Sequence, residues 1–106
     1  MAELGERARK VLAMLHKEPE DAFLLYAMAQ EYRKAQMWDE SLACFNRLIG
    51  LQPDYAPAYH QSAQVRAQIG DVEGARRTYA QGIEAAIRSH NAHAQAEMRA
   101  ELEALG

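Results

Sequence analysis

The sequence repeats itself with a period of 34 residues, and this repetition restricts the fold more than any other feature. The residue pairs related by the shift are Pro19 and Pro53, Ala22 and Ala56, Leu25 and Tyr59, Ala29 and Ala63, Gln30 and Gln64, Phe45 and Tyr79, and Ile49 and Ile83. The shift also takes Arg33 to Ala67, so apolar positions are kept while surface positions drift. Self-similarity at such a period is typical of stacked repeats, in which each unit buries its apolar face against a neighbour.

Each repeat reads as two helices. Ala, Leu, Met, Glu, Gln, Arg and Lys dominate the chain, β-branched residues are scarce, and no segment alternates apolar and polar residues. Six helices are expected. The first lies at about 4–17, the second carries the stripe Ala22–Tyr32, and the third follows a turn at 35–37. The fourth runs from an N-cap at about Asp54 to Gly70, the fifth lies at about 72–89 and the sixth at about 92–105. All connections are short, so successive helices should pack antiparallel.

Composition excludes several classes of protein. The chain has 106 residues, enough for one domain, and a formal net charge of −3, without the basic excess of a nucleic-acid binder. Its apolar stretches are too short to cross a membrane, and its start has no signal-peptide core. The single cysteine, Cys44, excludes an internal disulfide and should pack as a small hydrophobe. These features favour the cytoplasm.

The repeated unit resembles the tetratricopeptide repeat (TPR) family. The positions that carry the resemblance are Leu25, Met28, Ala29, Tyr32, Ser41, Phe45 and Pro53 in the first unit, and Tyr59, Ala63, Gly70, Asp71, Ala75 and Tyr79 in the second. Departures are Gln36 for the family's Gly, Ser62 for its Leu, Arg66 for its Tyr and Ile87 for its Pro. These departures affect the packing around Arg66 and leave the fold unchanged.

The resemblance implies an all-α helical-repeat solenoid of about six helices. It places an N-terminal helix at 3–18, repeats at 19–52 and 53–87, and a C-terminal capping helix at 91–105, within one domain over 1–106. Residues expected to be mostly buried are Leu25, Met28, Ala29, Phe45, Tyr59, Ala63, Ala75 and Tyr79. In the last helix, Met98, Leu102 and Leu105 should pack on the helix of Tyr79 and Ile83, leaving Glu97, Arg99, Glu101 and Glu103 for solvent.

The sequence contains no recognisable catalytic machinery. A phosphate loop, a paired-cysteine motif and a serine elbow are all absent, and no histidine is placed near Cys44. His90, His93 and Glu97 have the spacing of metal ligands on one helical face, but His90 falls at a helix break. We therefore expect neither an enzyme nor a bound metal or cofactor. His16 and His60 are interpreted as surface or groove residues.

The resemblance implies a protein-interaction module whose concave groove holds a peptide or protein segment. The residues expected to face the groove are Phe23, Tyr26, Gln30, Arg33, Lys34, His60, Gln61, Gln64 and Gln68. The family's carboxylate clamp is not expected, because its positions hold Tyr26, Gln30, Pro57, Gln61 and Gln64, none of which is a cation. Three alternatives stay open: self-association through an imperfectly capped edge, a polar face without a partner, and a metal-binding protein or enzyme that would rest only on His90, His93 and Glu97. The expected oligomeric state is a monomer or a weak homodimer.

Overall fold

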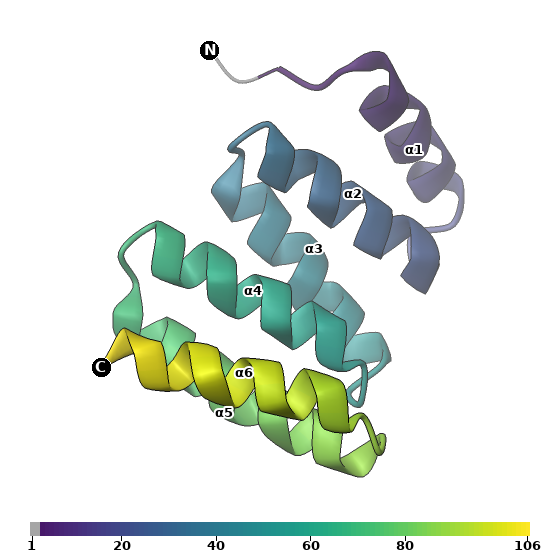
Figure 1. Ribbon diagram of the computed structural model, residues 1–106. Coiled ribbons are helices and arrows are strands. Elements are labelled where there is room, and N and C mark those ends of the chain that lie inside the picture. Colours follow the sequence, from purple (N-terminus) through teal and green to yellow (C-terminus); the bar gives the residue numbers. More distant parts are fainter. Residues whose placement is uncertain (1–2) are drawn as a thin grey trace. The chain divides into compact units, whose positions relative to one another are not determined.

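The computed structural model describes residues 3–106, and its regular structure over that range is entirely α-helical (Figure 1). The helices are α1 (Glu6–Lys17), α2 (Ala22–Lys34), α3 (Trp38–Leu51), α4 (Ala56–Gln68), α5 (Val72–Arg88) and α6 (Ala92–Leu105). The predicted all-α class with six helices is confirmed. Residues 1 and 2, the start of the predicted domain, lie outside the described residues.

Side-chain caps fix the start of three helices. Asp21, Asp71 and Asn91 each accept a hydrogen bond from the backbone N–H three residues later, at 2.9 to 3.0 Å. The predicted cap at Asp54 is wrong. Tyr55 is the N-cap of α4, and Asp54 accepts a hydrogen bond from Arg88 Nε at 2.6 Å instead.

The start of the first helix needs adjustment, whereas the glycine expected at the end of the fourth helix is confirmed. The first helix begins at Glu6, two residues later than expected from Leu4, because Gly5 is extended, with ψ 178°. The turn after α4 depends on Gly70, whose φ of +89° lies in the left-handed region that favours glycine. Gln36 and His90 adopt the same region at the turns after α2 and α5, with φ of 60° and 56°.

The described residues form two compact units, the first ending at Gln52 and the second covering Pro53–Gly106. In the first unit, α2 packs against both α1 and α3, and neighbouring helices run in opposite directions (Figure 1). The close approach of α2 and α3 is visible in one buried hydrogen bond: Ser41 Oγ donates to the Ala29 carbonyl at 2.9 Å. Small side chains at both positions permit this approach.

In the second unit, α5 packs against both α4 and α6, and α6 also contacts α4. Met98 of α6 is fully buried in one apolar cluster with Tyr79 and Ala86 of α5, and Ile83, Leu102 and Leu105 pack against that cluster. The predicted packing of α6 on α5 is therefore confirmed. So is the predicted burial of all eight core residues, which are at most 6% exposed.

The exact repeat boundaries and the capping role of residues 91–105 stay predictions. None of the described helices combines the length and apolar character that crossing a membrane requires.

Candidate functional site

The predicted groove residues of the first unit lie along one stripe of α2. Phe23 and Lys34 are exposed, and Tyr26, Gln30 and Arg33 are half-buried. Steps of three and four residues place these side chains on one face of the helix. The stripe offers an aromatic ring at its start, amide and phenol groups in its middle, and two cations at its end.

Tyr26 belongs partly to the core of this unit. Its ring meets the ring of buried Phe45 edge-on, with the centroids 6.4 Å apart and the planes at 71°. Tyr26, which was expected to face the groove, therefore also packs against the core of this unit. Loss of this ring would remove a packing contact as well as a surface group.

Lys34 and Arg7 converge on one acidic side chain. Lys34 Nζ lies 3.7 Å from Glu31 Oε2, and Arg7 Nε lies 3.8 Å from the same oxygen. Glu31 is largely buried, with 13% of its side chain exposed, whereas Lys34 keeps 71% of its side chain in solvent. The Lys34 ammonium therefore remains accessible from solvent.

The predicted groove residues of the second unit lie on α4, where His60, Gln61 and Gln64 are half-buried and Gln68 is exposed. Two of them bind Glu101 of α6. His60 Nε2 lies 2.7 Å from Glu101 Oε2, and Gln64 Nε2 donates to Glu101 Oε1 at 2.9 Å. The Tyr79 hydroxyl of α5 donates to the same Oε1 at 2.9 Å. We refer to His60, Gln64, Tyr79 and Glu101 as the Glu101 cluster.

The expectation that Glu101 points to solvent is wrong, because α6 packs across α4 and α5 and turns this carboxylate inward. Burial by itself raises the pKa of Glu101, but hydrogen bonds from Gln64, His60 and Tyr79 favour the ionised form, and the net pKa lies below its usual value. The carboxylate therefore stays charged at neutral pH and holds the His60 and Gln64 side chains in place.

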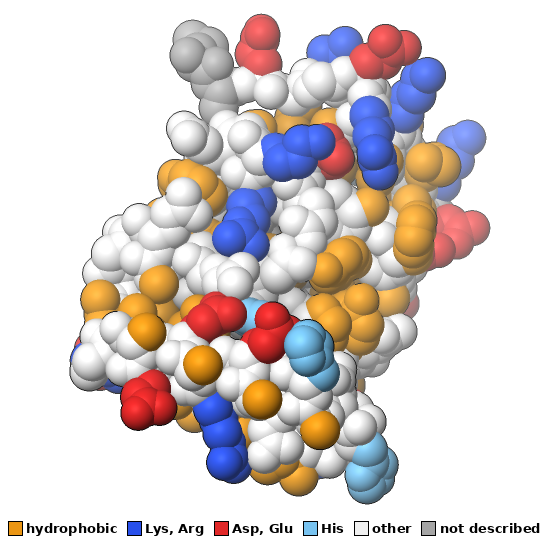
Figure 2. All heavy atoms as spheres, in the orientation of Figure 1, with side chains coloured by type: hydrophobic (Ala, Val, Ile, Leu, Met, Phe, Trp, Pro, Cys, Tyr) orange, Lys and Arg blue, Asp and Glu red, His pale blue; other side chains and the backbone are white. Residues whose placement is uncertain are grey.

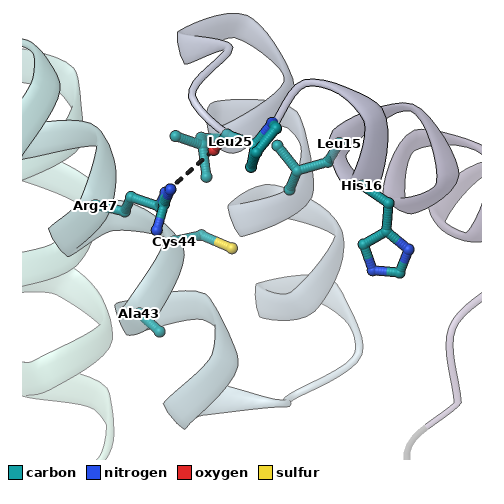
Figure 3. Close-up of a pocket in the computed structure, with 7 residues that line it drawn as sticks. Leu15, His16, Leu25, Ala43, Cys44 and Arg47 are labelled. Carbon is teal, nitrogen blue, oxygen red and sulfur yellow. Dashed lines mark hydrogen bonds between the residues drawn. The ribbon is translucent and has the colours of Figure 1, made fainter.

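A hollow of about 320 Å³ opens on the first unit between α1, the loop at Pro19, and α3 (Figure 3). Cys44 lines it beside Leu15 and Leu25, and Arg47 Nε donates to the Pro19 carbonyl at its edge. Cys44, which was expected to pack as a small hydrophobe, is half-buried at the edge of this surface hollow. Burial raises the pKa of its thiol to about 11, so the nucleophilic thiolate is scarce at neutral pH.

Comparison with known proteins now identifies the family. A tetratricopeptide repeat domain protein from Salinibacter ruber, solved in solution by NMR, is 32% identical to this chain. The match covers 82% of this chain and 88% of that protein, with a TM-score of 0.77. A tetratricopeptide repeat domain protein from the same organism, solved by crystallography, is 30% identical to this chain. The match covers 80% of this chain and 94% of that protein, with a TM-score of 0.74. The chain belongs to the tetratricopeptide repeat family.

Another solved structure shares the fold at lower identity. PcrH, whose crystal structure contains the chaperone binding region of PopD, is 16% identical, with a TM-score of 0.86 over 92% of this chain and 74% of its own. No protein-family model matches the TPR chain, and no curated protein sequence matches it.

The three residues with the spacing of metal ligands, His90, His93 and Glu97, are only partly brought together. His93 Nε2 lies 3.1 Å from Glu97 Oε1 one turn along α6, whereas His90 lies in the turn before the helix begins. Over residues 3–106, no group of three His, Cys, Asp or Glu side chains is arranged to hold a metal ion.

Sequence reasoning missed the role of Glu101. The N-caps of α4 and α6, Tyr55 and Asn91, are 36 residues apart and not 34, since 91 − 55 = 36. By this spacing Glu101 corresponds to Val65, which is fully buried. This alignment needs the α4 cap at Tyr55, which the sequence analysis placed at Asp54, so it becomes available only with the structure.

Proposed function

We propose that this TPR chain is a protein-interaction module that binds a polypeptide segment through the α2 stripe in the first unit and the α4 residues Gln61 and Gln68 in the second. Membership of the family carries this proposal. The similar fold of PcrH, which was solved with the chaperone binding region of PopD, supports a polypeptide as the kind of ligand.

The chemistry of the α2 stripe suits an extended segment with acidic side chains. Gln30 has an amide that can both donate to and accept from a peptide backbone, and Tyr26 has a ring on which a side chain can pack. Arg33 and Lys34 end the stripe with two positive charges, which attract carboxylates and should mainly raise the association rate.

On α4, the Glu101 cluster serves the proposed site indirectly. The cluster fixes His60 and Gln64 from the α6 side, so these two residues would support the binding face and would not be its main contacts. Gln61 and exposed Gln68 are the α4 residues that would contact the partner. The proposal concerns binding and includes no catalytic step, and a cytoplasmic location stays a prediction.

Site-specific photo-crosslinking tests this proposal in a lysate of the source cells. A photoreactive phenylalanine derivative replaces Gln30 on α2 or Gln68 on α4, and Asn46 on α3 or Ala80 on α5 in matched controls, which are exposed positions. We expect both test positions to crosslink the same polypeptide, and the control positions to crosslink it much less.

The captured polypeptide is then titrated against the purified chain. The double substitution Arg33→Glu, Lys34→Glu should weaken binding about tenfold or more and reduce its dependence on salt. Equal crosslinking from Asn46 and Ala80, or unchanged affinity after charge reversal, would show that binding occurs on another surface.

A further inference from the structure

An apolar hollow lies at the α1 end of the first unit. It has a volume of about 330 Å³, and its lining residues are Met14, Lys17, Glu18, Asp21, Phe23 and Leu24. Met14 is 49% exposed and Phe23 is 79% exposed, which makes Phe23 the most exposed large hydrophobic residue described. Phe23 is therefore mostly in contact with water and Met14 about half, so this surface leaves apolar area in water.

The internal repeat shows what kind of element fits the hollow. Two shifts of 34 residues align α1 with α5, so that Met14 corresponds to Gly82 and Glu18 to Ala86. Alignment of the N-caps Asp21 and Asn91 matches α2 with α6, so that Leu24 corresponds to Ala94. These three counterparts are all buried. A Cβ on Gly82 would lie 2.7 Å from Tyr59 Cβ of α4, and Ala86 and Ala94 share a cluster with Ala56 and Ala63 of α4. In the second unit, therefore, a helix lies over the positions that form the hollow in the first.

Within residues 3–52, no helix takes the place that α4 has in the second unit. The hollow is therefore a helix-sized surface that the repeat pattern leaves uncovered in the described chain. The remaining question is which helix covers it.

A second copy of this chain is a poor occupant. Its α6 is the helix of the required kind, but Arg99 stands eight residues after the α6 cap, where α2 and α4 have Ala29 and Ala63. On α1, two shifts of 34 residues place Arg7 at the position of Ala75. If α6 of one copy packed on α1 of another, Arg99 and Arg7 would meet where the two helices cross. The corresponding positions elsewhere in the chain are the small residues Ala29, Ala63 and Ala75. Both arginines are exposed.

The charge of α1 identifies a better occupant. The helix carries Arg7, Arg9, Lys10 and Lys17 against Glu6, a net charge of +3 (4 − 1), whereas the whole chain has −3. Figure 2 shows several Lys and Arg side chains where α1 lies in Figure 1, with acidic side chains between them. The same charge opposes pairing of two α1 edges with each other and attracts an acidic segment. Glu18, the C-cap of α1, and Asp21, the N-cap of α2, also line the hollow, together with Lys17.

We propose that this hollow docks an amphipathic helix of another polypeptide, with an apolar stripe over Met14 and Phe23 and Asp or Glu side chains on the flank that faces α1. The docked helix would lie on α1 and α2 as α4 lies on α5 and α6. This surface is separate from the α2 and α4 residues of the proposed function, apart from Phe23, which borders both.

The test uses the full chain and a synthetic 18-residue helical peptide with a Leu and Ala stripe and Glu flanks. A matched peptide has Lys in place of every Glu. Binding is followed by NMR shifts of the ¹⁵N-labelled chain. We expect the acidic peptide to shift residues of α1 and the start of α2, to bind more weakly at high salt, and to bind at least tenfold more tightly than the basic peptide.

Two substitutions locate the binding surface. Met14→Asp should weaken the acidic peptide at least tenfold. Ile87→Asp is the control, because Ile87 is also 49% exposed but lies on α5 in the second unit, and it should leave the affinity unchanged. Circular dichroism checks that both variants remain folded, as their exposure leads us to expect.

Four outcomes would overturn this inference: no shifts at millimolar acidic peptide, shifts confined to α4 and the middle of α2, equal losses in both variants, or equal binding of the basic peptide. A solution mass that doubles with concentration and returns to that of the monomer in Met14→Asp would show instead that a second copy covers the hollow. If the Arg33→Glu, Lys34→Glu variant lost binding of the acidic peptide while Met14→Asp kept it, the peptide would bind the α2 stripe and not the hollow.

Discussion

Glu101 Oε2 lies 2.7 Å from His60 Nε2, although the two residues are 41 positions apart. Together with the hydrogen bonds from Gln64 and Tyr79, this pairing joins all three helices of the second unit through one carboxylate. The apolar contacts of Met98 set how closely α6 approaches α5. The carboxylate fixes the axial position and the rotation of α6 relative to α4 and α5, because hydrogen bonds are directional.

Glu101→Gln should destabilise the chain at neutral pH by about 1 kcal/mol, because neutral hydrogen bonds replace charge-assisted ones. The pKa of Glu101 is lowered on folding, so its charged form stabilises the folded state above the unfolded pKa. That contribution is lost as the pH falls through the lowered folded pKa. Urea melts at pH 7 should therefore separate the variant from the wild type, and melts in strong acid should not.

Glu103→Gln is the matched control for this prediction, because Glu103 is exposed on the same helix. It should leave the urea midpoint unchanged at both pH values. A gap between wild type and Glu101→Gln that persists undiminished in acid would contradict the assigned role of the charge.

Ala29→Leu and Ala63→Leu should each lower the free energy of unfolding by about 1–3 kcal/mol, because each adds three heavy atoms to a fully buried helix crossing. Ala80→Leu on α5 adds the same atoms at an exposed position and should change little. Thermal melts measure all three. Equal melting temperatures for the three variants would refute the assigned register of the repeats.

Met98→Ala should cost about 2–5 kcal/mol, since it removes a fully buried side chain from the α5–α6 cluster. Deleting residues 91–106 should be more severe. It uncovers Tyr79 and Ala86, whose exposure would favour aggregation. Light scattering and denaturant melts detect both effects, and a truncated chain that stays monomeric with an unchanged midpoint would show that α6 is dispensable.

Cys44 should react slowly with iodoacetamide. With a pKa of about 11, its thiolate is a minor species at pH 8 and becomes abundant only as the pH rises towards that value. Mass spectrometry should show alkylation at least tenfold slower in the folded chain than in urea at the same pH. Comparable rates in both conditions would mean that the thiol is more exposed or more acidic than its position beside Leu15 and Leu25 indicates.

The fold could be predicted because the repetition recurs at residues whose size matters. Ala29 and Ala63 must be small and Phe45 and Tyr79 must be large for the same packing to form twice. Such positions restrict the structure locally, within one pair of helices. The helix order and the core therefore follow from residues close together in sequence, and only Gly5 and Tyr55 moved an expected boundary or cap.

The candidate site could be predicted less well. Register places a residue on a face of its own helix, but it does not say what a neighbouring helix brings to that face. Tyr26 meets Phe45 from α3, and His60 and Gln64 meet Glu101 from α6. In both cases the side chain lies on the expected helix face and has a second role that depends on distant residues.

Gly82 has a consequence for how freely this sequence can change. A Cβ there would lie 2.6 Å from Met98 Sδ and 2.7 Å from Tyr59 Cβ, so α4, α5 and α6 meet at a point where α5 has no side chain. The thioether could swing aside for an added methyl group, but Tyr59 Cβ is fixed to its backbone. Any larger residue at 82 therefore demands a compensating change in another helix. Substitutions at Gly82 of α5, Tyr59 of α4 and Met98 of α6 are therefore expected to depend on one another during evolution.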